Sequence, residues 1–286
     1  MTAVSATESL LPSPDLIPRR RALAASRVAF LSLLLRDATV LRKTIKEFIP
    51  RTLLQPFLLV FVFTYVFPKI GQGVGGGGAA SSEFSTVLVA GVVGLSIMFQ
   101  GVQSVALPMV QEFGYTREIE DRVLAPMPVW AVALEKVASG AIQAVIAALV
   151  VFVLATFIPA TPVHLSIHWL YLVTILPLSA MMSAALGLTI GTRVEPRQVP
   201  LIFSLLVLPM TFLGAVYYPW QGLTPLPWLK WSVLVNPLIY LSEGMRLSLT
   251  KGVPHMPVAA VYAALVAFTA VFSKLGIDGF KKRVLS

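Results

Sequence analysis

Apolar residues gather into long runs along this chain, and the charged residues are confined to the segments between the runs. Five stretches contain no Asp, Glu, Lys or Arg: residues 52–68, 84–111, 137–192, 198–229 and 252–273. A helix of about 18 or more apolar residues is long enough to cross the hydrocarbon core of a bilayer. The pattern therefore predicts an all-α polytopic membrane protein.

Prolines, glycines and polar residues divide these runs into six expected membrane spans, within a single transmembrane domain over residues 23–286. A disordered tail is expected over residues 1–22, because its beginning is rich in Ser, Thr and Pro. The spans are expected near residues 49–67, 86–110, 137–157, 169–191, 201–218 and 257–272. In the fourth span, small residues repeat every four positions and predict a close helix crossing: Ser183, Gly187 and Gly191.

Residues 23–48, ahead of the first span, show the period of an amphipathic helix. Apolar positions recur at spacings of three and four: Leu31, Leu34, Ala38, Leu41, Ile45 and Phe48. Other positions hold the basic residues Arg36, Arg42, Lys43 and Lys46. We expect a helix that lies in the membrane interface and is attracted to anionic lipid. A cytosolic helix packed on a partner is the alternative.

The net charge of +9 reflects an uneven distribution of Lys and Arg rather than a nucleic-acid-binding surface. With six spans, 18 of the 22 Lys and Arg residues fall on the side of the termini, and four fall on the other side: Lys69, Lys230, Arg246 and Lys251. Positive charges collect on the cytoplasmic side of membrane proteins. Both termini are therefore expected to be cytoplasmic, in the plasma or inner membrane of the cell.

Residues 231–241 form a further apolar stretch, but its 11 residues are fewer than the roughly 17 that a crossing helix needs. We expect a re-entrant element that enters the membrane from outside, between the fifth and sixth spans. The aromatic residues around it fit an outer interfacial belt: Tyr217, Tyr218, Trp220, Trp228 and Trp231.

The residue inventory argues against chemistry within this chain. It has no Cys, three His that fall outside the expected spans, and no charged residue near the centre of a span. We expect no catalytic residue, no metal site and no bound cofactor, because proton-driven or catalytic membrane proteins need such groups. The sequence GQGVGG at residues 71–76 follows a membrane helix rather than a strand, so it is interpreted as a flexible linker and not as a nucleotide site.

The polar segment between the second and third spans, residues 111–136, is where energy from another subunit could enter. Thr116 suits a helix N-cap, and acidic residues follow it in the first turn. Pro126 and Pro128 are expected to stop this helix. It is either a solvated loop helix or a coupling helix that docks into a cytosolic subunit through Thr116, Glu118, Ile119, Glu120, Arg122, Val123, Leu124 and Pro128.

Uncharged polar, aromatic and Met residues in the second and fifth spans suit a pathway for an adaptable apolar cargo. The candidates are Ser96, Phe99, Gln100, Gln103, Ser204, Met210 and Thr211. Hydrogen bonding between helices is the alternative role of these side chains.

The layout resembles the type-2 ABC export permeases, which include daunorubicin-resistance-like membrane subunits and lipid-linked polysaccharide exporters. The basic helix before the first span, the six spans and the long outside segment between the last two carry part of the resemblance. The stretch REIEDRVLAPMPVWAVALEKV after the second span is similar to a family stretch with acidic, basic, Leu, Pro and Lys positions. NPLIYLSEGMR matches the family pattern N-P-x-x-Y-x-x-E-x-x-R through Asn236, Pro237, Tyr240, Glu243 and Arg246.

The resemblance implies a half-transporter. Two copies, or this chain and a sister permease, would pair with two ATP-binding subunits that hold ATP and Mg, and would export an amphipathic or lipid-linked cargo. We interpret the five motif residues as an extracellular gate in which Glu243 and Arg246 form a latch. A surface ion pair is the alternative for those two residues. A lipid-modifying transferase and a channel or scaffold are the alternatives for the whole chain.

Overall fold

The computed structural model describes residues 19–71, 79–116, 119, 122, 125–159, 163–195, 198, 201, 205 and 209–285. Most of these residues are helical, and their only β-pairing is a single bridge between Leu165 and Thr250. The prediction of an all-α fold is therefore confirmed.

Five helices in the described part of the chain are long and apolar enough to cross a membrane. Each overlaps one of the six expected spans. They are α2 (Ile45–Phe61), which continues through the π-helical turn η2 (Val62–Val66) into α3 (Phe67–Lys69), followed by α4 (Ala79–Gln111), α6 (Val129–Phe157), α7 (Trp169–Arg193) and α11 (Val258–Leu285).

Several helix ends differ from the expected limits. α6 begins at Val129 rather than at residue 137, because the charged residues in its first turns find ion partners inside the protein. α11 continues to Leu285 rather than ending at residue 272. α1 (Arg19–Lys43) begins inside the tail that was expected over residues 1–22.

The fifth expected span, residues 201–218, lies partly outside the described residues. Its described part is helical at residues 209–213 and forms turns and bends at residues 214–218. Ala215 has a left-handed backbone with φ of 52°, a conformation that interrupts a right-handed helix. The expected helix end at Tyr218 is therefore wrong, and the total number of spans stays a prediction.

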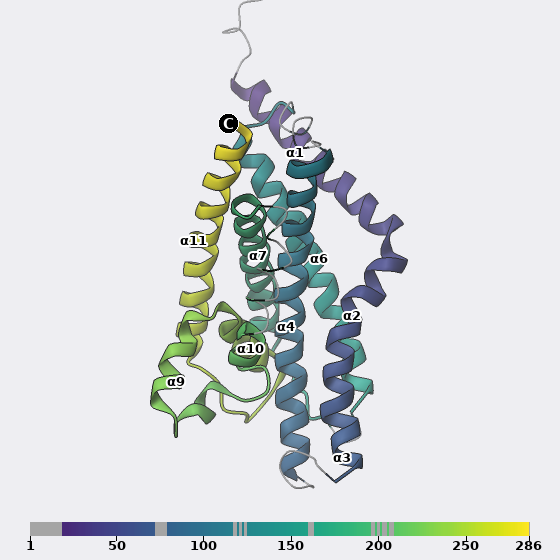
Figure 1. Ribbon diagram of the computed structural model, residues 1–286, viewed down its shortest axis with the longest axis vertical. Coiled ribbons are helices and arrows are strands. Elements are labelled where there is room, and N and C mark those ends of the chain that lie inside the picture. Colours follow the sequence, from purple (N-terminus) through teal and green to yellow (C-terminus); the bar gives the residue numbers. More distant parts are fainter. Residues whose placement is uncertain are drawn as a thin grey trace, which may run out of the picture.

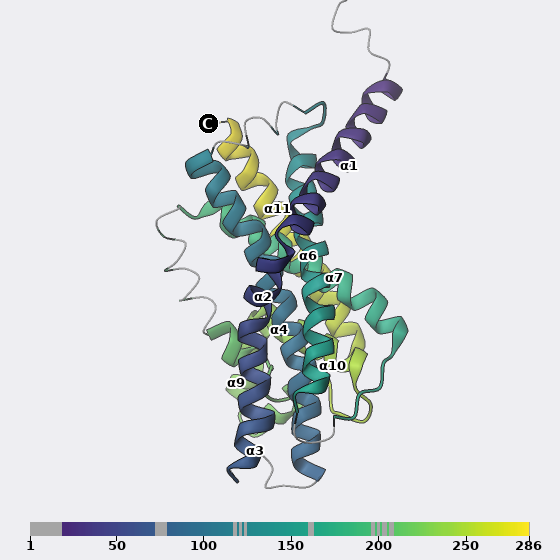
Figure 2. The same ribbon diagram turned by 90° about the vertical axis from the view of Figure 1, so that its right-hand side faces the viewer.

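Figures 1 and 2 show an elongated bundle in which α4 packs against α2, α6, α7 and α10 (Pro237–Leu249). α1 and the last turns of α11 lie at one end of the long axis, which we call the terminal end. α3 lies at the opposite end, which we call the distal end, and α9 (Pro227–Ser232) lies in the distal half of the bundle.

Small residues allow α4 and α7 to approach closely. A Cβ atom added to Gly187 of α7 would lie 2.6 Å from the backbone oxygen of Val102, and one added to Gly191 would lie 2.7 Å from Met109 Cβ. Both distances are shorter than any real carbon contact, so the crossing of the two helices requires glycine. The close crossing expected from the small-residue repeat in the fourth span is confirmed.

α10 is enclosed by the rest of the chain in the distal half. All of its residues are buried, and it packs against α4, α7 and α11. The segment before α7 is hydrogen-bonded to the C-terminal end of α10. Ser166 N–H donates to the backbone oxygen of Leu249 at 2.9 Å, and His168 N–H donates to the backbone oxygen of Ser248 at 2.8 Å. α10 is reached from residue 219 through η5 (Trp220–Leu223), α9 and η6 (Val233–Val235).

Candidate functional site

The NPLIYLSEGMR motif begins α10 with a capping residue. The side-chain oxygen of Asn236 accepts a hydrogen bond from Leu238 N–H at 3.0 Å, as in a helix N-cap. Its side-chain nitrogen donates to the backbone oxygen of Met210 at 2.9 Å. Pro237 occupies the first helical position, where a backbone N–H would have no partner within the helix, so its missing N–H costs nothing. Asn236 thus starts α10 and also ties it to the helical turn that carries Met210.

Glu243 and Arg246, one turn apart on α10, form a fully buried ion pair. One carboxylate oxygen of Glu243 accepts hydrogen bonds from Arg246 at 2.5 Å and from Trp220 N–H at 2.7 Å. The other oxygen accepts from Met256 N–H at 2.6 Å, and Arg246 donates to the backbone oxygen of Ala215 at 2.8 Å. Both side chains are 0% exposed, so the alternative of a surface ion pair is wrong.

The turn around Ala215 is clamped between two helices. Its backbone has a left-handed conformation, which costs an L-residue about 1–2 kcal/mol. Arg246 of α10 holds its carbonyl oxygen from one side. On the other side, Gly91 of α4 lies so close that an added Cβ would be 2.2 Å from the backbone oxygen of Val216. Only a glycine at residue 91 allows α4 this near to the turn.

The segment between residues 219 and 236 folds back on itself. The indole N–H of Trp220 donates to the backbone oxygen of Lys230 at 3.0 Å, and the Lys230 ammonium lies 4.6 Å from the centre of a Trp220 ring. The Tyr240 hydroxyl of α10 donates to a backbone oxygen of η6 at 3.0 Å. The indole rings of Trp228 and Trp231 are left exposed.

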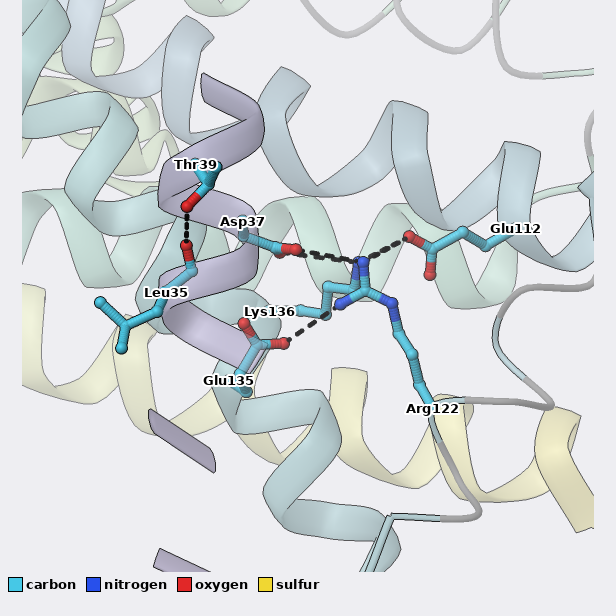
Figure 3. A network of polar contacts seen from close by, with 7 residues as sticks. All are labelled: Leu35, Asp37, Thr39, Glu112, Arg122, Glu135 and Lys136. Atoms are coloured by element: carbon cyan, nitrogen blue, oxygen red, sulfur yellow. Dashed lines mark hydrogen bonds and ion pairs between the residues drawn. The ribbon is translucent and has the colours of Figure 1, made fainter. Parts of the chain in front are cut away.

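A second set of charged side chains meets towards the terminal end (Figure 3). The guanidinium of Arg122 lies 3.1 Å from Asp37 of α1, 3.6 Å from Glu112 of the π-helical turn η3 (Glu112–Thr116) and 3.6 Å from Glu135 of α6. Lys136 pairs with Glu112 at 2.6 Å and lies 3.9 Å from Asp37. We call these five residues the charge cluster.

The charge cluster is withdrawn from solvent. Its side chains are between 0% exposed, for Glu135, and 15% exposed, for Asp37. Burial is the largest single influence on the pKa of Arg122 and lowers it, but the carboxylates of Glu112, Asp37 and Glu135 together outweigh burial and raise this pKa above its ordinary value. Arg122 is therefore a permanent cation, and removing it would leave three buried carboxylates facing one Lys.

The expected docking residues differ in burial, and only some of them belong to the described residues. Ile119 is 5% exposed and packs in the hydrophobic core, and Arg122 is buried in the charge cluster. Thr116 ends η3, and Pro128 is the N-cap residue of α6. Glu118, Glu120, Val123 and Leu124 lie outside the described residues. The interpretation of this segment as a solvated loop helix therefore does not hold for Ile119 and Arg122, and the docking role stays a prediction.

The expected pathway residues on α4 make bonds within the chain. Gln100 accepts a hydrogen bond from Thr52 of α2 at 2.9 Å, and Gln103 accepts one from Arg51 of α2 at 3.4 Å. Ser96 is buried and donates to a backbone oxygen of its own helix at 2.7 Å. Gln100 and Gln103 thus form hydrogen bonds between helices, which was the alternative to a role in the cargo pathway.

Three of the other expected pathway residues are partly or fully buried in the chain. Phe99 is half-buried against the core, Met210 holds Asn236 through its backbone, and Thr211 is buried. Ser204 lies outside the described residues.

Asp37, Glu112 and Glu135 belong to the charge cluster although no motif in the sequence marks them. One signal was present in the sequence: Asp37 is the only acidic residue of α1, a helix otherwise rich in Arg and Lys. Its partner Arg122 lies 85 residues further along the chain, and no local pattern predicts that contact.

Comparisons with known proteins show the family of the chain. Residues 29–250 match the family model described as ABC-2 type transporter, and this range includes both the charge cluster and the α10 motif. The chain is similar to the inner membrane transport permease YadH of Escherichia coli (strain K12), with 24% identity over 233 residues that cover 78% of this chain and 84% of that protein. The YadH permease of Shigella flexneri is similar to the same extent.

Proposed function

The chain belongs to the ABC-2 type transporter family, and on that premise we propose that it is the membrane subunit of an ATP-driven exporter whose motor docks on residues 116–128. Membership of this family, together with the similarity to transport permeases, makes the chain a multi-pass membrane permease of an ABC transporter that associates with ABC ATP-binding subunits. Family membership also favours transport over the lipid-modifying transferase.

The charge cluster is the observation that carries this proposal. The sequence has no charged residue near the centres of the expected spans, which is where proton-coupled transporters place such groups. Arg122 and Ile119, two residues between η3 and α6, contact the helix bundle through ion pairs and the hydrophobic core, respectively. A force applied to the segment between α4 and α6 would pass directly into both helices.

The orientation follows from the distribution of charge. We place the terminal end in the cytoplasm of an inner-membrane protein, because 18 of the 22 Lys and Arg residues are assigned to that side in the six-span topology. α1 would then lie at the cytoplasmic surface of the membrane beside anionic lipid. The expected re-entrant element, residues 231–241, would comprise the end of α9, η6 and the first turn of α10, with the exposed Trp228 and Trp231 in the outer interface.

The distal end would hold the extracellular gate. Glu243 joins α10 to the segments that lead into η5 and α11, and Asn236 joins it to the turn at Met210. In this proposal the pair of Glu243 and Arg246 is the latch that keeps these segments together. Opening towards the outside would require the gate to move as a unit, since separating the two charges in a buried site is costly.

The cargo class comes from the family resemblance. We propose an amphipathic or lipid-linked substrate that passes between two copies of this chain, or between it and a sister permease. The ATP and Mg would be held by the partner subunits. Phe99 and Met210 remain candidates for contact with the cargo, because their side chains are only partly buried in the single chain.

Co-purification tests the proposal. The tagged chain is isolated from its native membrane in a mild detergent, and we expect a stoichiometric partner whose sequence contains a G-x-x-x-x-G-K-[ST] phosphate-binding loop. The complex should hydrolyse ATP, and a panel of amphipathic drugs, lipids and lipid-linked glycans should identify the cargo by stimulation of that activity. Isolation of an active chain that has no nucleotide-hydrolysing partner would contradict the proposal.

A further inference from the structure

α1 is held to the bundle by few contacts. Ala29, Phe30 and Leu33 pack partly buried against the core, whereas Val28, Leu31 and Leu35 on the remaining surface are exposed. A small apolar contact of this kind does not by itself fix the rotation or the register of a helix, because apolar packing has no direction. Asp37 adds directional contacts, to Arg122 at 3.1 Å and to Lys136 at 3.9 Å.

The charge cluster joins side chains from four parts of the chain. Asp37 comes from α1, Glu112 from η3, which directly follows α4, Arg122 from the segment proposed to dock, and Glu135 and Lys136 from α6. Each cation contacts at least two carboxylates, and each of those carboxylates comes from a different element. Shifting one element alone would separate opposite charges at a site with little solvent to replace the lost contacts.

We infer that Asp37 and Glu135 are positioning residues for Arg122, and that they make α1, the docking segment and α6 move as a single body. This inference rests on the proposed function and adds to it the interfacial helix. Motion that a motor subunit imposes on the docking segment would reach α6 through the Arg122–Glu135 contact and the membrane surface through the Arg122–Asp37 contact. α1 would then shift together with the permease during each cycle rather than serve as a passive anchor.

The natural absence of Cys makes a distance measurement simple. Two exposed positions, Val28 on α1 and Trp130 on α6, are changed to Cys and spin-labelled. Pulsed electron paramagnetic resonance then gives the distribution of label distances for the chain in nanodiscs. The same measurement is made on the complex with its ATP-binding subunit, both nucleotide-free and trapped with ATP and vanadate. Val28 lies nine residues before Asp37, so a rotation about Asp37 displaces its label by several ångströms at about 1.5 Å rise per residue.

We expect one narrow distribution with the same mean in both nucleotide states. Asp37→Asn should broaden the distribution about twofold, because it removes the charge that orients α1 towards Arg122. Asp37→Glu should restore the narrow distribution. The matched control is Glu47→Gln, an exposed acid near the start of α2, which should leave the distribution unchanged. If Asp37→Asn does not accumulate, Glu135→Gln is measured with the same labels and should also broaden it.

Two results would overturn the inference. One is a mean distance in the unmutated protein that shifts between the nucleotide-free and trapped states, since α1 and α6 would then move separately. The other is a distribution that stays narrow in Asp37→Asn. Because the chain alone can be measured, failure to find an ATP-binding partner would contradict the proposed function without deciding this inference.

Discussion

Glu243 and Arg246 pair at 2.5 Å with no exposure of either side chain, and the Glu243 carboxylate also accepts two backbone N–H groups from segments outside α10. Such a pair holds the chain together chiefly through the penalty for breaking it. Removal of one partner of a buried pair costs about 3–5 kcal/mol, whereas replacement of both partners by apolar residues is often tolerated. The motif residues therefore stabilise the packing of α10 against neighbouring segments, in addition to their proposed role as a gate.

Glu243→Ala is expected to lower the thermal unfolding temperature of the detergent-solubilised protein strongly, because it leaves Arg246 charged and buried. The double variant Glu243→Ala with Arg246→Met should recover much of the loss. Thermal unfolding of the two single variants and the double variant measures the coupling between the residues. If the unfolding temperature of the double variant falls by the sum of the two single decreases, the two residues do not act as a coupled pair.

Asn236 has two separable bonds. Asn236→Ala removes both the cap of α10 and the bond to Met210, and should cost about 1–2 kcal/mol. Asn236→Asp keeps the capping oxygen but cannot donate to Met210, so it should retain the cap and lose only the tie. Hydrogen exchange of the first turn of α10 distinguishes the two cases. Equal protection in Asn236→Ala and the unmutated protein would contradict the capping role.

The α4–α7 crossing depends on Gly187. Gly187→Ala places a Cβ atom 2.6 Å from a backbone oxygen of α4, and the overpacking should cost about 1–3 kcal/mol. Gly222→Ala is the control, since its nearest neighbour would lie 3.7 Å away. The membrane-inserted yield and the unfolding temperature of both variants check this. Equal stability of the two variants would mean that α7 can move aside without loss.

Arg122 should remain charged at every pH at which the protein is folded. Its raised pKa means that its contribution to stability is present below the unfolded-state pKa and is lost only as the pH rises through the still higher folded-state pKa. Between about pH 8 and pH 12 its contribution should therefore be constant, whereas the contribution of the Lys in Arg122→Lys should be lost as the pH rises above the ordinary Lys pKa of about 10.4. Thermal unfolding across this pH range compares the two proteins. A parallel pH dependence would argue against a cationic role for Arg122.

The sequence predicted the features of the fold that depend on local pattern. Charge-free runs located the five described long helices, and Ser183, Gly187 and Gly191 located the α4–α7 crossing. The sequence placed the start of α6 too late. The charge-free run begins only after Glu135 and Lys136, and charged residues were expected to lie in solvent rather than inside a membrane helix. These residues are inside the helix and neutralised by partners from other elements.

The two sites differ in how far the sequence could predict them. The residues of the α10 motif were identified, since they recur in a recognisable spacing, but their complete burial could not be derived from that spacing. Asp37 and Arg122 meet across 85 residues of chain. Only the packing of α1 on the end of the bundle brings them together, and that contact depends on tertiary structure rather than on any local pattern.

The central claim is that a separate motor drives this permease through the segment held by Arg122. Its most direct test is the ATPase activity of the purified complex carrying Arg122→Glu, beside Arg27→Glu at an exposed position of α1 as the matched control. We expect Arg122→Glu to abolish substrate-stimulated ATP hydrolysis or the association with the motor subunit, and Arg27→Glu to preserve both. Undiminished assembly and stimulated hydrolysis in Arg122→Glu, with the protein inserted at normal yield, would contradict the claim.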